Sequence, residues 1–387
     1  TTLALLAAKK LAIREQKLNT ITSESIESED VNWARQAAEL YPNIIHNVIG
    51  RQEFPTVYSN LEDIPLTDQP AGIINFIGSF RYSMEVIKAT GSQIHMSGEG
   101  GDAVVIAPHG YLADLVLRGQ IKTFIRHFFG WCRASKRISP IPLMSNIIRL
   151  STTSYRHWLS QQAQQLMTKQ ARHQQNQVLS LEWSEPADTV SWYTEEAIDL
   201  VVKGLQRYAT VALPFADLPG QHAAVAGIHL MGRFARVEQQ LAETYGVSID
   251  FPYLDSLVLD ACLSTKTENR TSPFAVKPIM YEAFHNDLPK SVLTRTTKGN
   301  YSPDILHGMH HNLALLKELL QNSRLADMGL IKIRDFRVAM ELVSTGLQRE
   351  LLGYFNETLV LELWLRRVLD GGYDFWMSES LRDAVTY

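Results

Sequence analysis

Residues 1–96 alternate between short β-prone segments and amphipathic helical segments, and this alternation constrains the fold more than any other feature. The helices and strands expected from it lie, in chain order, at residues 1–16 (helix), 18–22 (strand), 28–40 (helix), 44–49 (strand), 73–90 (helix) and 93–96 (strand). Apolar residues recur at helical spacing in the helical segments. Alternating elements of this kind build a mostly parallel sheet that carries helices on both faces. The sequence therefore predicts an α/β fold for this part of the chain.

After Ser97 the strand pattern stops, and from Tyr111 to the end the pattern is helical. We expect an α/β layer over residues 1–130 and a mostly helical region over residues 131–387. The helical region would be part of the same domain and would enclose the substrate. Residues 358–369 carry several leucines and are expected to form a helix that docks on the core.

Charge, cysteine and hydropathy patterns exclude several classes of protein. The formal net charge is −4 and no run of five like charges occurs, which argues against nucleic acid as a partner. The two cysteines are far apart and lack zinc-site spacing, as expected in a reducing cytoplasm. No apolar run is long enough to span a membrane. We therefore expect a cytoplasmic protein that binds neither nucleic acid nor a membrane.

The chain begins inside an apolar segment. Residues 1–8 have the periodicity of a buried helix, but no N-cap residue precedes them. A secretory signal would need a basic region before the segment and a small-residue cleavage site after it, and the sequence shows neither. We expect the natural protein to continue upstream of Thr1.

A glycine-rich loop with two carboxylates directly follows the expected strand at residues 93–96. Its sequence, at residues 97–102, is SGEGGD. Glycines allow a tight turn and a close approach to a ligand, and open α/β sheets bind ligands at this carboxyl edge. A carboxylate there can hold Mg²⁺ against phosphate oxygens or accept a proton from an amine. From the residues alone, a plain glycine turn with solvated acids is an equally good interpretation.

This loop, after the strand QIHM, resembles the second signature of asparagine-synthetase-type domains, which faces ATP. FPYLD at residues 251–255 is similar to the family's PFLD. RTTKG at residues 295–299 is similar to the segment that supplies the family's catalytic lysine. Three matches in the family's order are more specific than any one of them.

The resemblance implies a nucleotide-binding layer of the adenine nucleotide alpha hydrolase type. In that family a pyrophosphate loop, Ser-Gly-Gly-x-Asp-Ser, is followed by an apolar helix, and residues 1–6 are similar to this helix. The loop and the first strand would then lie upstream of Thr1. Residues 1–387 alone are therefore expected not to turn over ATP, because half of the pyrophosphate site would be missing.

The resemblance also implies ATP and Mg²⁺ as cofactors and gives roles to individual residues. Asp102 is similar to the family's Mg²⁺ ligand, and Glu99 to the acid that accepts a proton from the attacking amine. Lys298 is similar to the lysine that neutralises charge on the phosphate and on the tetrahedral intermediate. A hydrogen-bonded turn, a stabilised loop and a solvated lysine are the structural alternatives.

The resemblance also implies roles for five further positions near the nucleotide. Ser97, Gly98 and Gly100 would shape the nucleotide side of the pocket. Thr20 and Thr22 would approach the adenine, although an ordinary strand end explains them equally well.

Two arginines and one aspartate have simpler structural explanations. Arg81 and Arg295 could face phosphates, but surface salt bridges are commoner. Asp255, the last residue of FPYLD, more simply fixes the start of a helix.

Several positions depart from asparagine synthetase itself. Ala103 replaces the acid that usually follows the loop aspartate, and IAPHGY at residues 106–111 replaces Phe-Gly-Gly-Tyr. These departures resemble lasso-peptide macrolactam cyclases, as do the segments at residues 111–115, 298–301, 323–327 and 362–366.

A lasso-peptide cyclase activates an Asp or Glu side chain of a precursor peptide as the acyl-adenylate. The N-terminal amine of the peptide then attacks and closes an isopeptide-bonded ring. The resemblance therefore implies a precursor peptide as substrate, with a leader-peptide-binding protein and a protease as partners. The alternatives are an asparagine or β-lactam synthetase acting on a small amino acid, and a non-catalytic homologue that only holds a precursor peptide.

Overall fold

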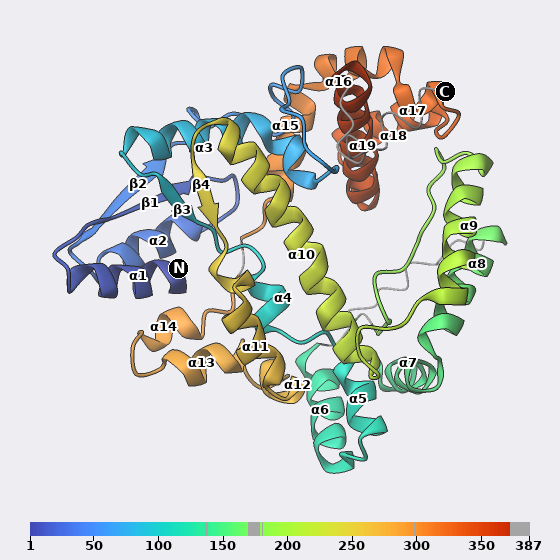
Figure 1. Cartoon of the computed structure of the whole chain (residues 1–387), viewed down its shortest axis with the longest axis horizontal. Helices are drawn as coiled ribbons and strands as arrows, with labels where there is room; N and C mark the ends of the chain where they lie inside the picture. Colours follow the sequence, from blue (N-terminus) through green and yellow to red (C-terminus); the bar gives the residue numbers. More distant parts are fainter. Residues whose placement is uncertain (136–137, 169–178, 180, 298, 372–387) are drawn as a thin grey trace, which may run out of the picture.

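The computed structural model describes residues 1–135, 138–168, 179, 181–297 and 299–371, and Figure 1 shows how their elements are arranged.

The N-terminal layer confirms the mixed α/β character, but its strands belong to two separate parallel pairs where a single sheet was predicted. Strands β1 (Leu18–Ser23) and β2 (Ile44–Ile49) form a parallel pair over their whole length. Helices α1 (Thr2–Ala12) and α2 (Asp30–Ala38) contact this pair. All four elements lie where the sequence pattern puts them, although α1 ends several residues earlier than expected.

A second parallel pair joins segments that are far apart in the sequence. Strand β3 (Ile94–Met96), which follows η1 (Gly72–Phe76) and α3 (Ile77–Ala89), pairs with β4 (Ser248–Asp250). The prediction that strands stop after Ser97 was wrong at β4. That strand has three residues, which is too short for an alternating pattern to show in the sequence.

The other elements of the described chain are helical, as predicted. In chain order they are α4 (Gly101–Val105), α5 (Tyr111–Leu117), α6 (Ile121–Ala134), α7 (Pro140–Thr152), α8 (Tyr155–Met167), α9 (Glu195–Val211), α10 (Pro219–Thr244), η2 (Pro252–Leu254), α11 (Ser256–Ser264), α12 (Thr267–Arg270), α13 (Pro278–Phe284), α14 (Lys290–Leu293), α15 (Ser302–His311), α16 (Leu313–Leu319), η3 (Leu320–Asn322), α17 (Arg324–Asp327), α18 (Ile333–Ser344), η4 (Arg349–Leu351) and α19 (Leu352–Gly371). Among the described residues, no helix is both long and apolar enough to cross a membrane.

Helix α10 is the longest of these and runs through the middle of the molecule (Figure 1). The N-terminal layer lies on one side of it, and α8 and α9 lie on the other. It contacts α4, α5, β4 and η1. Its buried residues Val237, Leu241 and Ala242 join the main hydrophobic core. Because α10 touches both strand β4 and the loop helix α4, it links the α/β layer to the helical region.

The C-terminal helix α19 docks on this core, which confirms the prediction for residues 358–369. Phe355, Leu359 and Leu363 are buried in the same cluster as residues of α3 and α10. Glu362 on this helix is fully buried, and its carboxylate accepts hydrogen bonds from the backbone N–H groups of Arg324 and Leu325, at 2.9 Å each. Two of the segments that resemble macrolactam cyclases, residues 323–327 and 362–366, therefore hold each other in place.

A buried carboxyl marks the contact between α5 and α10. Asp114 is fully buried, and its Oδ1 accepts a hydrogen bond of 2.8 Å from the N–H of Gly220. A Cβ on Gly220 would lie 2.5 Å from the backbone nitrogen of Tyr111, so only glycine allows this approach. Burial raises the pKa of Asp114 from 3.8 to about 6.

The raised pKa predicts a pH-dependent effect of Asp114→Asn on stability. The unfolded carboxyl ionises near its ordinary pKa, so the folded state is penalised as the pH rises, by about 3 kcal/mol above both values. Asparagine cannot ionise. Relative to the wild type, the variant should therefore gain up to about 3 kcal/mol between about pH 4 and about pH 8. Urea unfolding at several pH values measures this, with exposed Asp260→Asn as control; a pH-independent difference would contradict the burial argument.

Candidate active site

Two sequence motifs meet because their strands are paired. β3 leads into the loop at residues 97–102, and β4 leads into FPYLD at residues 251–255. Since the strands are parallel, both segments leave the same edge of the sheet. The N–H of Ser97 continues the pairing by donating to the carbonyl oxygen of Asp250 at 2.9 Å.

Two of the loop's three glycines lie in close contact with FPYLD. Gly100 has φ +79°, a left-handed conformation that favours glycine, and it stands directly before α4. A Cβ on Gly100 would lie 2.6 Å from Cδ2 of Leu254, and one on Gly101 would lie 3.0 Å from the ring of Tyr253. A Cβ on Gly98 would meet no atom within 4 Å, so this position faces open space. Gly100 and Gly101 serve the packing of the two motifs, whereas Gly98 leaves room at the surface of the loop.

A cavity of about 870 Å³ opens in front of the loop. Its walls come from the start of α1, the loop and α4, Tyr253, the start of α13 and the segment around residues 292–301. Gly98, Glu99, Gly100 and Asp102 all line it. The structure thus brings four of the predicted site residues together at one surface.

The side chain of Asp102 meets a lysine that the sequence analysis missed. Asp102 lies in the first turn of α4, and its Oδ1 is 2.7 Å from Nζ of Lys277. Lys277 lines the cavity and has φ +43° just before Pro278, at the start of α13. This left-handed conformation is uncommon for a lysine and fixes the direction in which its side chain leaves the backbone. No sequence signal distinguishes this lysine from a surface lysine, because both the conformation and the ion pair depend on tertiary structure.

Glu99 lies where two cavities meet. It lines the large cavity and also a smaller cavity of about 280 Å³ between η1 and α10. Its N–H donates to Oγ of Ser97 at 3.1 Å, so the Ser97 hydroxyl stabilises the turn. Ser97 itself is not among the residues that line the large cavity.

An ion pair closes one side of the large cavity. Arg295 pairs with the carboxylate of Asp30, which also accepts a hydrogen bond from the hydroxyl of Tyr301. The guanidinium carbon of Arg295 also lies 5.1 Å from the ring centre of Trp33. The structure therefore favours the salt-bridge interpretation of this arginine. The same interpretation holds for Arg81, whose Nη2 lies 2.9 Å from Oδ2 of Asp63.

Lys298 lies outside the described residues. The residues on either side of it, Thr297 and Gly299, line the large cavity. A Cβ on Gly299 would lie 2.5 Å from Oδ2 of Asp30, so the backbone passes close to this carboxylate.

Two predicted adenine contacts are not brought to this cavity. Thr20 and Thr22 are on β1, and neither is among the lining residues. Oγ1 of Thr22 forms a hydrogen bond of 3.1 Å with Nε2 of His46, and the carbonyl of Thr20 accepts one of 3.3 Å from Asn47. The adenine contact of these threonines stays a prediction. Asp255, by contrast, caps α11 through a 2.9 Å hydrogen bond from the N–H of Leu257, as predicted.

A family model described as asparagine synthase matches residues 1–366. The chain belongs to the asparagine synthase family. A comparison with curated proteins gives no match. The match covers the loop at residues 97–102, FPYLD and RTTKG, so all three motifs lie within one family domain. Membership of this family indicates ATP-dependent amide-bond formation in general.

The large cavity fits the ATP that asparagine synthases use. Gly98, Lys277 and Asp102 line the same cavity. An open glycine backbone, a cation and a carboxylate are groups that bind phosphates and their metal ion. Among the described residues, no three His, Cys, Asp or Glu side chains come together to hold a metal. Mg²⁺ commonly takes only one or two carboxylates and completes its shell with phosphate oxygens and water. Asp102 suits such a shared site.

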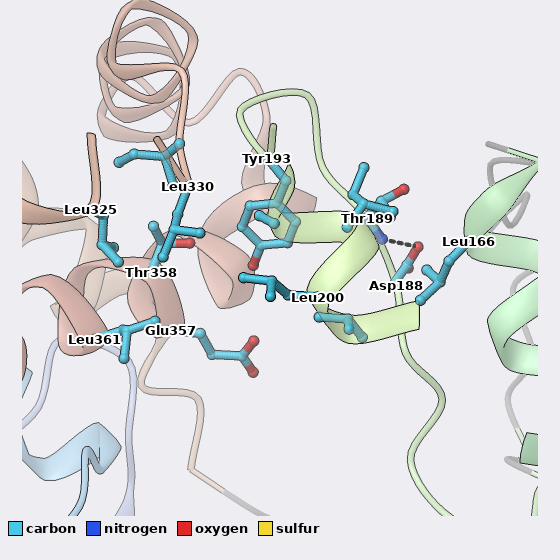
Figure 2. A pocket seen from close by; sticks show the side chains of 14 residues that line it. Leu166, Asp188, Thr189, Tyr193, Leu200, Leu325, Leu330, Glu357, Thr358 and Leu361 are labelled. Carbon is cyan, nitrogen blue, oxygen red and sulfur yellow. Dashed lines mark hydrogen bonds between the residues drawn. The ribbon is translucent and has the colours of Figure 1, made fainter. Parts of the chain in front are cut away.

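A third cavity, of about 400 Å³, lies between α9 and α19 and differs in character (Figure 2). Leucines from both sides face it, with Tyr193, Thr358 and Glu357 as polar neighbours. None of the described residues that line it is a lysine or an arginine. Because its described lining has no cation and no glycine loop, it suits phosphate less well than the cavity beside Asp102 does.

Proposed function

We propose that the protein joins a carboxylate to an amine in two steps within the large cavity. In the first step a carboxylate oxygen attacks the α-phosphorus of ATP, and pyrophosphate leaves with the broken P–O bond. In the second step an amine attacks the acyl-adenylate, the C–N bond forms, the C–O bond breaks, and AMP leaves. The observation that carries this proposal is the convergence of Gly98, Glu99, Asp102 and Lys277 at one cavity within a family domain.

Each residue would have a role that follows from its charge. Asp102 would hold Mg²⁺, which when bound supplies positive charge to the phosphate oxygens. Lys277, paired with Asp102 at 2.7 Å, would add a second positive charge on the same side. Glu99 would accept a proton from the amine as the C–N bond forms. The sequence resemblance adds Lys298 as the cation that neutralises the tetrahedral intermediate.

For the substrate, we propose a precursor peptide whose Asp or Glu side chain is activated and whose N-terminal amine is the nucleophile. Support comes from the departures at Ala103 and residues 106–111 and from the further segments that resemble macrolactam cyclases. On this proposal a leader-peptide-binding protein and a protease would act with the enzyme in the cytoplasm. A free amino acid or a β-lactam precursor is the alternative substrate.

Carboxylate-dependent ATP–pyrophosphate exchange with the full-length protein tests the proposal. We expect exchange with linear peptides that carry an internal Asp or Glu, and a cyclised product that is lighter by one water. If L-aspartate supports exchange and none of the peptides does, the protein is a synthetase that acts on a small substrate. Peptide binding without exchange for any carboxylate would identify a non-catalytic homologue.

A further inference from the structure

The smaller cavity beside Glu99 is bounded by three elements. Its walls come from η1 and the residues just before it, from Phe234 and Glu238 on α10, and from Asn356 on α19. Its volume of about 280 Å³ is suited to a small group. Glu99 is the residue it shares with the large cavity, so a group bound here would face an acyl group bound there.

One buried acceptor in the lining of this cavity lacks a donor. Asn75 is 1% exposed, and its Oδ1 has no hydrogen-bond partner among the described residues. Its Nδ2 is already directed to the carbonyl of Asn356, at 3.4 Å. A buried acceptor without a donor is unfavourable, so a ligand that donates hydrogen bonds would be stabilised here.

Glu238 adds a negative charge that no described residue neutralises. No hydrogen bond or ion pair links it to the described part of the chain, and no lysine or arginine lines the cavity there. The nearest cations on the same helix are engaged elsewhere. Arg233 donates to Gln69 at 2.8 Å, and Arg236 pairs with Asp68 at 2.6 Å.

We infer that this cavity binds the nucleophile in its ammonium form and that Glu238 takes the first proton from it. The inference rests on the proposed function and adds the place where the amine binds and the residue that takes its first proton. An ammonium group has three donors and one positive charge, which match two carboxylates and the Oδ1 of Asn75. The rings of Phe76 and Phe234 would face the carbon part of the amine.

The proton balance requires two acceptors. An ammonium group that becomes an amide N–H loses two protons in total. Glu238 takes the first, which frees the lone pair of the nitrogen, and that pair forms the bond to the acyl carbon. As the C–O bond to AMP breaks, Glu99 takes the second. Both protons pass to solvent when the products leave.

The pKa of Glu238, raised in part by the charge of Glu99, suits Glu238 to take the first proton. Burial, together with the nearby charge of Glu99, raises the pKa of Glu238 from 4.5 to about 7. A carboxyl with this pKa changes its protonation state easily near neutral pH, as a proton acceptor must.

The test compares two nucleophiles on one acyl donor. An N-acetylated form of a peptide that supports exchange cannot attack itself, so added methylamine or hydroxylamine must accept the acyl group. Methylamine is an ammonium ion at neutral pH and needs both acceptors, whereas hydroxylamine is uncharged and needs one. We expect Glu238→Gln to lower methylamide formation about a hundredfold and to leave hydroxamate formation and pyrophosphate exchange within about twofold of wild type.

Glu243→Gln, on an exposed turn of the same helix, is the matched control and should leave all three rates unchanged. Asn75→Ser is a second variant and should raise the KM of methylamine about tenfold with little effect on hydroxylamine. Equal loss with both nucleophiles, or no loss with either, would overturn the inference while the exchange still supported adenylation. Absence of exchange in the wild type would overturn the proposed function and the inference with it.

Discussion

Replacement of Asp102 by asparagine in the full-length protein is expected to lower ATP–pyrophosphate exchange about a thousandfold. Asparagine keeps the size of the side chain but removes the negative charge that would hold Mg²⁺ beside the phosphates. It also leaves Lys277 without the carboxylate that now lies 2.7 Å away. The loss should appear in kcat of the first step, since adenylation is the step that forms pyrophosphate.

Glu99→Gln should behave differently, because a proton acceptor acts only when the amine attacks. We expect exchange to persist in this variant and amide formation to fall. Asp260→Asn, an exposed aspartate on α11, controls for the loss of one negative charge. If Asp102→Asn and Glu99→Gln retained exchange equally, the separate roles of the two carboxylates would have to be abandoned.

The fold could be predicted from the sequence where local patterns are long. β1, β2, α2 and the C-terminal helix α19 lie where periodicity places them. β4 could not be found, because a three-residue strand has no period and is defined by its pairing with β3. Pairing between residues about 150 positions apart is a tertiary property that no local window reports.

The candidate site also has one part that local sequence signals predict and another that depends on tertiary structure. The loop at residues 97–102 could be predicted because glycine spacing and carboxylates are local signals. The positions of Lys277 and Glu238 could not be predicted. The side chain of Lys277 reaches the cavity because its backbone has a positive φ, and Glu238 reaches it because α10 runs past the loop. Arg295 belongs to both parts. From the sequence a salt bridge was the commoner expectation and a phosphate contact the other one, and only the structure identifies Asp30 as its partner.

The large cavity is lined by Lys277 and Arg295, which both lie in the helical region of the chain. The helical region therefore contributes positive charge to the candidate active site. The α/β layer supplies the carboxylates, and the segment from α13 to residue 301 supplies the cations. The Asp102–Lys277 pair joins these two regions, but both side chains are exposed, so the pair adds little to stability. A substitution on the cationic side should therefore affect catalysis more than folding.

Lys298→Ala in the full-length protein is expected to slow product formation about a hundredfold to a thousandfold. The reason is electrostatic: negative charge develops on the leaving phosphate and on the tetrahedral oxygen, and a preorganised cation beside them is worth a few kcal/mol. Thr297 and Gly299, on either side of the lysine, line the large cavity. Lys298→Arg should recover little, because a planar guanidinium does not replace a compact ammonium in a crowded site.

Single-turnover formation of the cyclised peptide measures this effect, and thermal unfolding tests whether the fold survives. Lys290→Ala is the matched control, since Lys290 is an exposed lysine on α14 in the same segment and does not line the cavity. We expect both variants to unfold at the temperature of the wild type, and a lower unfolding temperature for Lys298→Ala would mean that slow cyclisation reflects a damaged fold. If Lys298→Ala cyclised the peptide within a few fold of the wild-type rate, and Lys290→Ala did the same, Lys298 would be a surface lysine. The cation for the intermediate would then have to be Lys277, whose ammonium already lies beside Asp102.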